Sequence, residues 1–235
     1  MLDGFSLALT PDEVTVILLS LRVAGWAVVW SLPPAILAAW VLARCSFPGK
    51  TLFDGFVHLP LVLPPVVVGY ILLLILGTRG PVGGLLYQWF GVRLIFTTTG
   101  AIVAVAVCSF PLMVRAIRLS IEAIDTGLES AARTLGAGPI DRFFTITLPL
   151  MLPGVLSGSI VAFAAALGEF GAVITFASNI PGQTQILPLA IYAATQTPDG
   201  DAMAARLSLI ALVIALAALM ASEIAASRVK TMIGR

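Results

Sequence analysis

Long apolar segments alternate with short polar ones along this chain of 235 residues. A helix of about 20 apolar residues spans the hydrocarbon layer of a membrane, which is about 30 Å thick. Five segments reach that length, so we expect an all-α integral membrane protein with about five transmembrane helices. The predicted spans cover residues 14–43, 52–78, 97–114, 146–176 and 202–226. The first and fourth are longer than a perpendicular span needs, so they should tilt, bend or project into water.

Residues 120–145 form a polar, amphipathic interruption of this pattern. Apolar residues recur on one face at helical spacing, namely Ile121, Ile124, Leu128, Ala131, Ala132 and Leu135. Glu129 and Arg133 lie on another face as a favourable i,i+4 pair. Gly136 suits the end of one helix, and Pro139 suits the first turn of the next. We expect a helix–Gly–helix loop outside the lipid that enters a groove of another protein. An ordinary interfacial loop is the alternative.

Two other connecting segments have features that a simple turn does not require. Residues 80–96 are aromatic and apolar, as is typical of a segment at the membrane surface. Residues 186–194 lie between Pro181 and Pro198 and predict a short interfacial helix. Both segments are either surface connectors or a platform for a soluble protein that delivers substrate from outside.

Composition supports the membrane class. Hydrophobic residues make up 59% of the chain and charged residues 11%, against about a quarter charged in soluble proteins. The net charge of +1 predicts neither a nucleic-acid partner nor an acidic one. Membrane lipid is the expected surrounding.

The basic residues orient the bundle. With the N-terminus outside, nine of the thirteen Lys and Arg fall on the inner side. They are Arg44, Lys50, Arg115, Arg118, Arg133, Arg142, Arg228, Lys230 and Arg235. An odd number of spans then places the loop at 120–145 and the C-terminus in the cytoplasm.

Prolines and one acidic residue mark a candidate pathway. Pro64 and Pro65 lie in the second span, where each removes a backbone donor and tends to kink the helix. Static kinks and a mobile pathway both remain open, and residues 61–68 are the predicted gate lining. Glu169 binds a cation, relays a proton or pairs internally. Its neighbours Gly168 and Gly171 permit close helix approach, which favours packing.

The sequence predicts no catalytic, cofactor-binding or metal-binding residue. It has no glycine loop of the kind that cradles phosphate. His58 is the only histidine and reads as a packing residue, since a lone histidine does not make a metal site. Cys45 and Cys108 lie in separate segments, so we expect no disulfide.

The loop resembles the cytoplasmic loop of ABC importer permeases. That loop is written E-A-A, three residues, G, nine residues, I-x-L-P. The matching positions are Ala131, Ala132, Gly136, Ile146, Leu148 and Pro149. The glutamate lies one place earlier than in the pattern, at Glu129, and Ser130 precedes the two alanines. In the family this loop docks on the ATP-hydrolysing subunit.

Further strings resemble the molybdate permeases, which are type I ABC importers grouped with the sulfate permeases. They start at Cys45, His58, Phe110, Gly168 and Ser178. The resemblance implies a homodimer, two ATP-binding cassette subunits that bind ATP and Mg, and a periplasmic molybdate-binding protein. It also implies a multi-pass protein of the inner membrane.

The expected organisation is a periplasmic N-terminus at 1–13, a transmembrane permease domain at 14–226 and a cytoplasmic tail at 227–235. The expected function is import of molybdate, with tungstate also accepted. Three alternatives remain: a sulfate or thiosulfate permease, a cation-coupled secondary carrier that uses Glu169, and a structural scaffold.

Overall fold

The structure, a computed structural model, describes residues 9–232, and all regular structure in that range is helical. Its elements are α1 (Pro11–Arg44), α2 (Lys50–Val62), α3 (Pro65–Leu76), α4 (Pro81–Phe90), α5 (Thr98–Glu122), α6 (Thr126–Thr134), α7 (Pro139–Arg142), the π-helix η1 (Phe143–Thr147), α8 (Leu148–Leu167), α9 (Gly171–Phe176), α10 (Leu187–Thr195) and α11 (Asp201–Met232).

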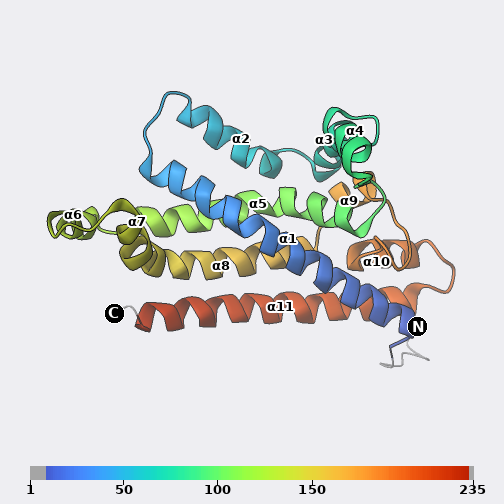
Figure 1. Cartoon of the computed structure of the whole chain (residues 1–235). Coiled ribbons are helices and arrows are strands. Elements are labelled where there is room, and N and C mark those ends of the chain that lie inside the picture. Colours follow the sequence, from blue (N-terminus) through green and yellow to red (C-terminus); the bar gives the residue numbers. More distant parts are fainter. Residues whose placement is uncertain (1–8, 233–235) are drawn as a thin grey trace.

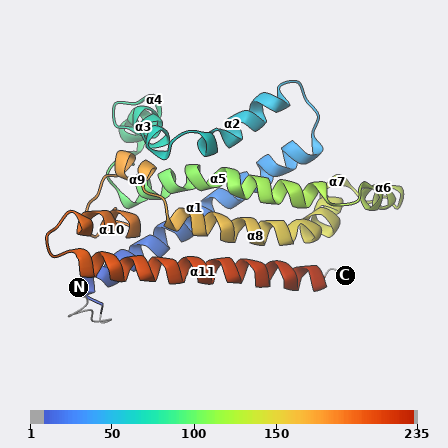
Figure 2. The ribbon, with the colours of Figure 1, turned by 180° about the vertical axis from the view of Figure 1, so that it is seen from behind.

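The long helices α1, α5, α8 and α11 lie side by side and run between two ends of an elongated bundle (Figures 1 and 2). The end that carries α6, α7 and the last turns of α11 is called the loop end. The opposite end, called the far end, carries α3, α4, α9, α10 and the start of α1 (Figure 1). The chain therefore enters the bundle at one end and leaves it at the other.

The all-helical membrane fold is confirmed with four to five candidate spans, and two of the predicted spans are broken. Four helical stretches are long and apolar enough to cross a membrane, and they are Pro11–Arg44, Thr98–Glu122, Pro139–Leu167 and Asp201–Ala221. The pair α2 and α3, whose axes differ by 115°, makes a fifth span if the two helices are counted together. The expectation of one helix over 52–78 was therefore wrong.

Packing distinguishes α2 from α1, which also contains a Pro-Pro pair but stays continuous. Leu63 and Pro64 are extended at the break, with ψ of 141° and 135°. Yet Pro33 and Pro34 remain inside α1, which is continuous over 34 residues. Buried residues line α1 along most of its length, whereas Val57 is the single buried residue of α2 among those described. Among the described residues, α2 therefore has much less buried surface than α1 to keep it continuous with its neighbour.

Other element ends differ from the predicted ones. Helix α5 continues to Glu122, beyond the predicted end at residue 114, because Ile117 and Ile121 stay in the core. The fourth span ends at Leu167, and the chain up to Phe176 forms the separate helix α9. Helix α11 extends to Met232, and residues 233–235 of the predicted tail lie outside the described range, as do residues 1–8 of the predicted N-terminal segment.

Small residues allow the central helices to approach closely. A side chain at Gly154 or Gly158 would collide with Ser120 or Ala116 of α5. This is the packing expected in lipid, where close backbone contact takes the place of a hydrophobic drive between helices. Helix α11 instead exposes apolar side chains such as Leu212, Val213 and Leu219, as a lipid-facing helix does.

Candidate coupling loop and membrane pathway

The loop at the loop end is built by local capping. The Asp125 side chain accepts a hydrogen bond from the Gly127 amide at 2.7 Å and starts α6. The helix ends in a Schellman motif, in which the Ala137 amide donates to the Ala132 carbonyl at 3.0 Å. Gly136 has φ of +89°, a left-handed conformation that a side chain disfavours. The predicted glycine elbow is therefore formed.

The second arm of the loop leads directly into the bundle. Pro139 opens the short helix α7, as predicted for that position. The π-helix η1 follows and contains Ile146, while Leu148 and Pro149 begin α8. A π-helical turn inside a helix often lies at a functional site. Here it joins the exposed loop to a membrane span, so a force on the loop reaches α8 without a flexible connection.

Apolar side chains of the loop lack cover from the rest of the chain. Leu135 is 88% exposed, Ile140 74%, Phe144 60% and Leu128 50%. These four residues are called the loop apolar patch. The loop lies beyond the ends of α5 and α8 (Figure 1). Several exposed apolar side chains on one projecting loop are typical of a protein-binding segment.

The structure divides the residues that were predicted to share one loop helix. Ile121 and Ile124 are buried in the bundle core, and a turn separates them from α6. The expectation of one continuous apolar face from residue 121 was wrong, because Asp125 caps a new helix there. Ala131 and Ala132 lie in α6, as does Glu129, whose side chain is outside the described part of the structure.

The two breaks in the spans meet at the far end. A Cβ atom built on Gly171 would lie 2.9 Å from Pro65 Cβ and 2.9 Å from Val66 N. A Cβ atom built on Gly69 would lie 2.7 Å from the Ala172 carbonyl oxygen. The start of α3 is therefore packed tightly against α9. Interrupted helices of this kind are common around transport pathways, and the bend falls within the predicted gate lining at 61–68.

Glu169 lies in the break between α8 and α9. Its Oε1 accepts a hydrogen bond from the Ala172 amide at 2.9 Å, so the carboxylate caps the short helix α9. The Cys108 thiol of α5 is also within hydrogen-bonding reach of this carboxylate. Gly168 does not pack closely, since a Cβ atom there would meet only the Ala165 carbonyl oxygen, at 3.7 Å. Of the two predicted glycines, only Gly171 sits at a tight contact.

A polar network on the loop-end half joins α2 to α5, and the sequence reading did not identify it. Arg118 Nη1 lies 2.9 Å from Asp54 Oδ2, and Arg118 Nε lies 2.8 Å from Glu122 Oε1. His58 Nδ1 lies 2.9 Å from the Asp54 carbonyl oxygen and 3.0 Å from Asp54 Oδ1. The i,i+4 spacings of Asp54 with His58 and of Arg118 with Glu122 were the available signals. Contact across 64 residues was not readable from them.

The remaining candidate groups are the two cysteines and the possible metal ligands. Cys45 and Cys108 are both free thiols. Within residues 9–232, no three His, Cys, Asp or Glu side chains come together in a group that could hold a metal ion.

Together, the broken spans and the helix–Gly–helix loop define the type I ABC importer permease fold. Two solved structures share it. A chain of a bacterial ABC transporter that imports alginate matches with a TM-score of 0.72 at 19% identity, covering 92% of this chain and 80% of that one. A chain of the inward-facing MetNI methionine ABC transporter matches with a TM-score of 0.67 at 15% identity, covering 93% and 94%.

Residues 33–231 match the family described as binding-protein-dependent transport system inner membrane component, and the chain belongs to this family. It is a multi-pass protein of the inner membrane. The molybdenum transport system permease protein ModB of Escherichia coli (strain K12) is 58% identical over 92% of this chain and 94% of its own. ModB of Haemophilus influenzae is 54% identical over 95% and 97%. The sulfate transport system permease protein CysT of Salmonella typhimurium is 38% identical over 74% and 63%.

Proposed function

We propose that this chain is the membrane-spanning subunit of an ATP-driven importer that carries molybdate, and also tungstate, across the inner membrane. ATP and Mg are held by a separate ATPase chain, and the permease couples to that chain mechanically. The N-terminus lies in the periplasm, and the loop and the C-terminus lie in the cytoplasm.

The observation that carries the proposal is the loop apolar patch on a rigid elbow. Leu135 and Ile140 lie on opposite sides of Gly136 and are both largely exposed. A soluble ATPase that binds this patch has a firm connection to α8 through η1. ATP-driven movement of the loop then tilts α8 relative to its neighbours. Such coupling requires that the ATPase contacts differ in free energy between the two states of the permease.

Apolar surfaces exposed in the described part of the chain support the proposed partners. Helix α2 exposes apolar side chains on most of its surface, with Leu52 at 79%, Phe56 at 74% and Val62 at 81%. A second copy of the chain covers this surface in the proposed homodimer. Two ATPase subunits then bind the two loops, and a periplasmic molybdate-binding protein binds the far end.

The sequence relatives favour molybdate over sulfate as the proposed substrate. The relatives named for molybdenum transport are 58% and 54% identical, whereas the sulfate permease is 38% identical over a smaller share of the chain. Glu169 is a poor ligand for a divalent oxyanion because like charges repel strongly in a medium of low dielectric constant. Selectivity in this proposal therefore resides in the binding protein.

The test is uptake of radiolabelled molybdate by vesicles that contain the permease with its ATPase. Uptake should require ATP and the binding protein, and excess tungstate should compete better than excess sulfate. Uptake that sulfate abolishes at equal concentration would assign the sulfate group instead. Uptake that continues without the ATPase but stops when the membrane gradient is collapsed would assign a cation-coupled carrier. The absence of any uptake by a complex that hydrolyses ATP would refute the transport proposal.

A further inference from the structure

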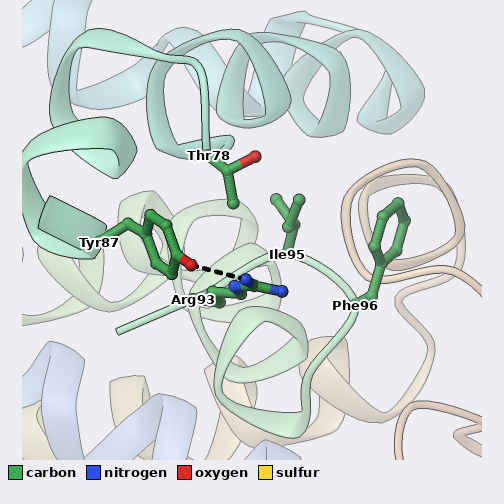
Figure 3. A pocket seen from close by; sticks show the side chains of 5 residues that line it. All are labelled: Thr78, Tyr87, Arg93, Ile95 and Phe96. Carbon is green, nitrogen blue, oxygen red and sulfur yellow. Dashed lines mark hydrogen bonds between the residues drawn. The ribbon is translucent and has the colours of Figure 1, made fainter. Parts of the chain in front are cut away.

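A cavity of about 570 Å³ opens at the far end of the bundle. Its walls come from three consecutive parts of the chain: the connection after α3, helix α4, and the segment before α5 (Figure 3). The lining residues are Thr78, Tyr87, Arg93, Ile95 and Phe96. This cavity is called the outer pocket.

Arg93 is the charged group of the outer pocket, and Tyr87 holds it in place. Arg93 Nη2 donates a hydrogen bond to the Tyr87 hydroxyl at 2.7 Å, and the guanidinium carbon lies 4.6 Å from the centre of the Tyr87 ring. A guanidinium group has five N–H donors in a planar fork. The Tyr87 hydroxyl occupies one of them, and within residues 9–232 no carboxylate pairs with Arg93. The fork therefore faces the pocket with donors to spare (Figure 3).

The chain segment that lines the pocket carries charge of one sign. Residues 77–97 contain Arg79 and Arg93 and no aspartate or glutamate. The net charge of the whole chain is only +1, so it does not reveal this local excess of positive charge. A local positive surface attracts a negative one and speeds their association.

The outer pocket and helix α4, which forms one of its walls, expose aromatic side chains. Tyr87, Trp89, Phe90 and Phe96 are 40–75% exposed. Aromatic residues and arginine are the side chains that contribute most of the binding energy in interfaces. Phe96 also has φ of +59°, a left-handed conformation that is uncommon for a bulky residue. Such conformations occur most often at functional sites.

We propose that the outer pocket receives an acidic side chain of the soluble binding protein, with Arg93 as its partner. The inference rests on the proposed function, since the binding protein is the delivering partner in that scheme. An arginine and a carboxylate form two parallel hydrogen bonds, which fix orientation as well as contribute energy. A lipid phosphate reaches an interfacial arginine without a walled cavity, so the pocket favours a protruding side chain.

The test uses the assembled permease–ATPase complex in vesicles and the purified, molybdate-loaded binding protein. The measured quantity is the concentration of binding protein that gives half of the maximal ATPase stimulation. Arg93→Glu should raise it by about tenfold or more, as for loss of a central charge pair. Tyr87→Phe, which keeps the ring and loses the hydroxyl, should raise it less.

Arg79→Glu is the matched control, because it makes the same charge change at the same end outside the outer pocket. It should raise the half-maximal concentration by less than about threefold, as expected of a rim charge. Arg93→Lys should retain part of the response if Arg93→Glu proves unstable.

Three results would overturn the inference while the proposed function stands. One is wild-type uptake that depends on the binding protein, with an unchanged titration for Arg93→Glu. Another is an equal rise in the half-maximal concentration of binding protein for Arg79→Glu and Arg93→Glu, which would indicate a general electrostatic effect and not a specific contact. The third is a change in dimer content or in dependence on anionic lipid, with normal stimulation per complex. Failure of the wild-type complex to respond to the binding protein would instead count against the proposed function.

Discussion

Glu13 and Arg206 form an ion pair that joins the first turn of α1 to the first turns of α11. Arg206 Nη2 and Nε lie 2.8 Å and 3.0 Å from Glu13 Oε1. The Glu13 side chain is fully buried and that of Arg206 is 14% exposed. Glu13 also accepts a hydrogen bond from the Thr10 amide and so completes a capping box. One carboxylate thus caps α1 and connects the start of the first helix to the start of the last described helix.

Breaking this pair should destabilise the protein. Removal of the guanidinium leaves the fully buried Glu13 carboxylate without its paired cation, which costs about 3–5 kcal/mol. Removal of the carboxylate loses the ion pair and the cap of α1. We expect Glu13→Ala to lower the thermal unfolding midpoint of the detergent-solubilised protein clearly. Arg206→Met, which leaves the buried Glu13 carboxylate without its cation, should lower the midpoint at least as much. Asp12→Asn, an adjacent exposed position, is the control and should leave the midpoint unchanged. Equal midpoints for Glu13→Ala and Asp12→Asn would show that the pair contributes nothing.

The elbow of the loop offers a matched pair of glycines. Gly136 has φ of +89° and Gly138 has φ of −67°, and a Cβ atom would meet nothing within 4 Å at either position. Valine at Gly136 is therefore penalised by conformation alone, at about 1–2 kcal/mol. We expect Gly136→Val to insert normally but to retain less ATPase on purification and to import more slowly. Gly138→Val should behave much closer to the wild type. Similar losses in both variants would show that the left-handed elbow is not the decisive feature.

The apolar pattern predicted the spans and the loop because both depend on local signals. A run of apolar residues identifies a span wherever it occurs, and Gly136 with Pro139 marks the elbow without any tertiary information. The short helix at 186–194 was found for the same reason, since Pro188 opens α10. These elements are determined by residues that lie next to one another in the chain.

The features that were missed depend on contacts between distant residues. The break at Leu63 goes with the poor packing of α2. The prolines alone do not reveal it, because Pro33 and Pro34 stay helical in α1 whereas Pro64 and Pro65 follow the break. Helix α5 extends to Glu122 because the core continues beyond the apolar run. Glu13 and Arg206 are 193 residues apart. Each of these residues was visible in the sequence, but the distant residues that it contacts in the fold could not be read from it.

The contact between α3 and α9 should not tolerate a side chain at Gly171. A Cβ atom there would press on Pro65 and on the Val66 backbone, and overpacking of this kind costs about 1–3 kcal/mol. We expect Gly171→Ala to lower the thermal midpoint and the yield of folded protein. Gly168→Ala is the control, because its new methyl group makes only an ordinary contact at 3.7 Å. If the two variants unfold at the same temperature, α9 and α3 are not tightly coupled.

Glu169 should act on helix α9 rather than on substrate. Its carboxylate accepts the Ala172 amide, and loss of a capping group of this type costs about 1 kcal/mol. We expect Glu169→Ala to lower the thermal midpoint, while Glu169→Gln, which keeps an acceptor oxygen, lowers it less. The concentration of molybdate that half-saturates uptake should stay the same in both. Unchanged stability together with an altered ion preference in reconstituted vesicles would reassign Glu169 to ion binding.

The bend between α2 and α3 should change its exposure during the transport cycle. Val62, before the bend, is 81% exposed, and Val68, after it, is 4% exposed against α9. If the bend is the gate, single cysteines in a background without Cys45 and Cys108 should report two behaviours. Val62→Cys should react with a water-soluble thiol reagent at rates that differ severalfold between the ATP-bound and nucleotide-free complex, because α2 is largely exposed, with Val57 its one buried residue among those described. Val68→Cys should remain slow in both states, since Gly69 and Gly171 lock α3 onto α9. Identical rates in both nucleotide states across residues 61–68 would remove this segment from the gate and leave the bend as a static kink.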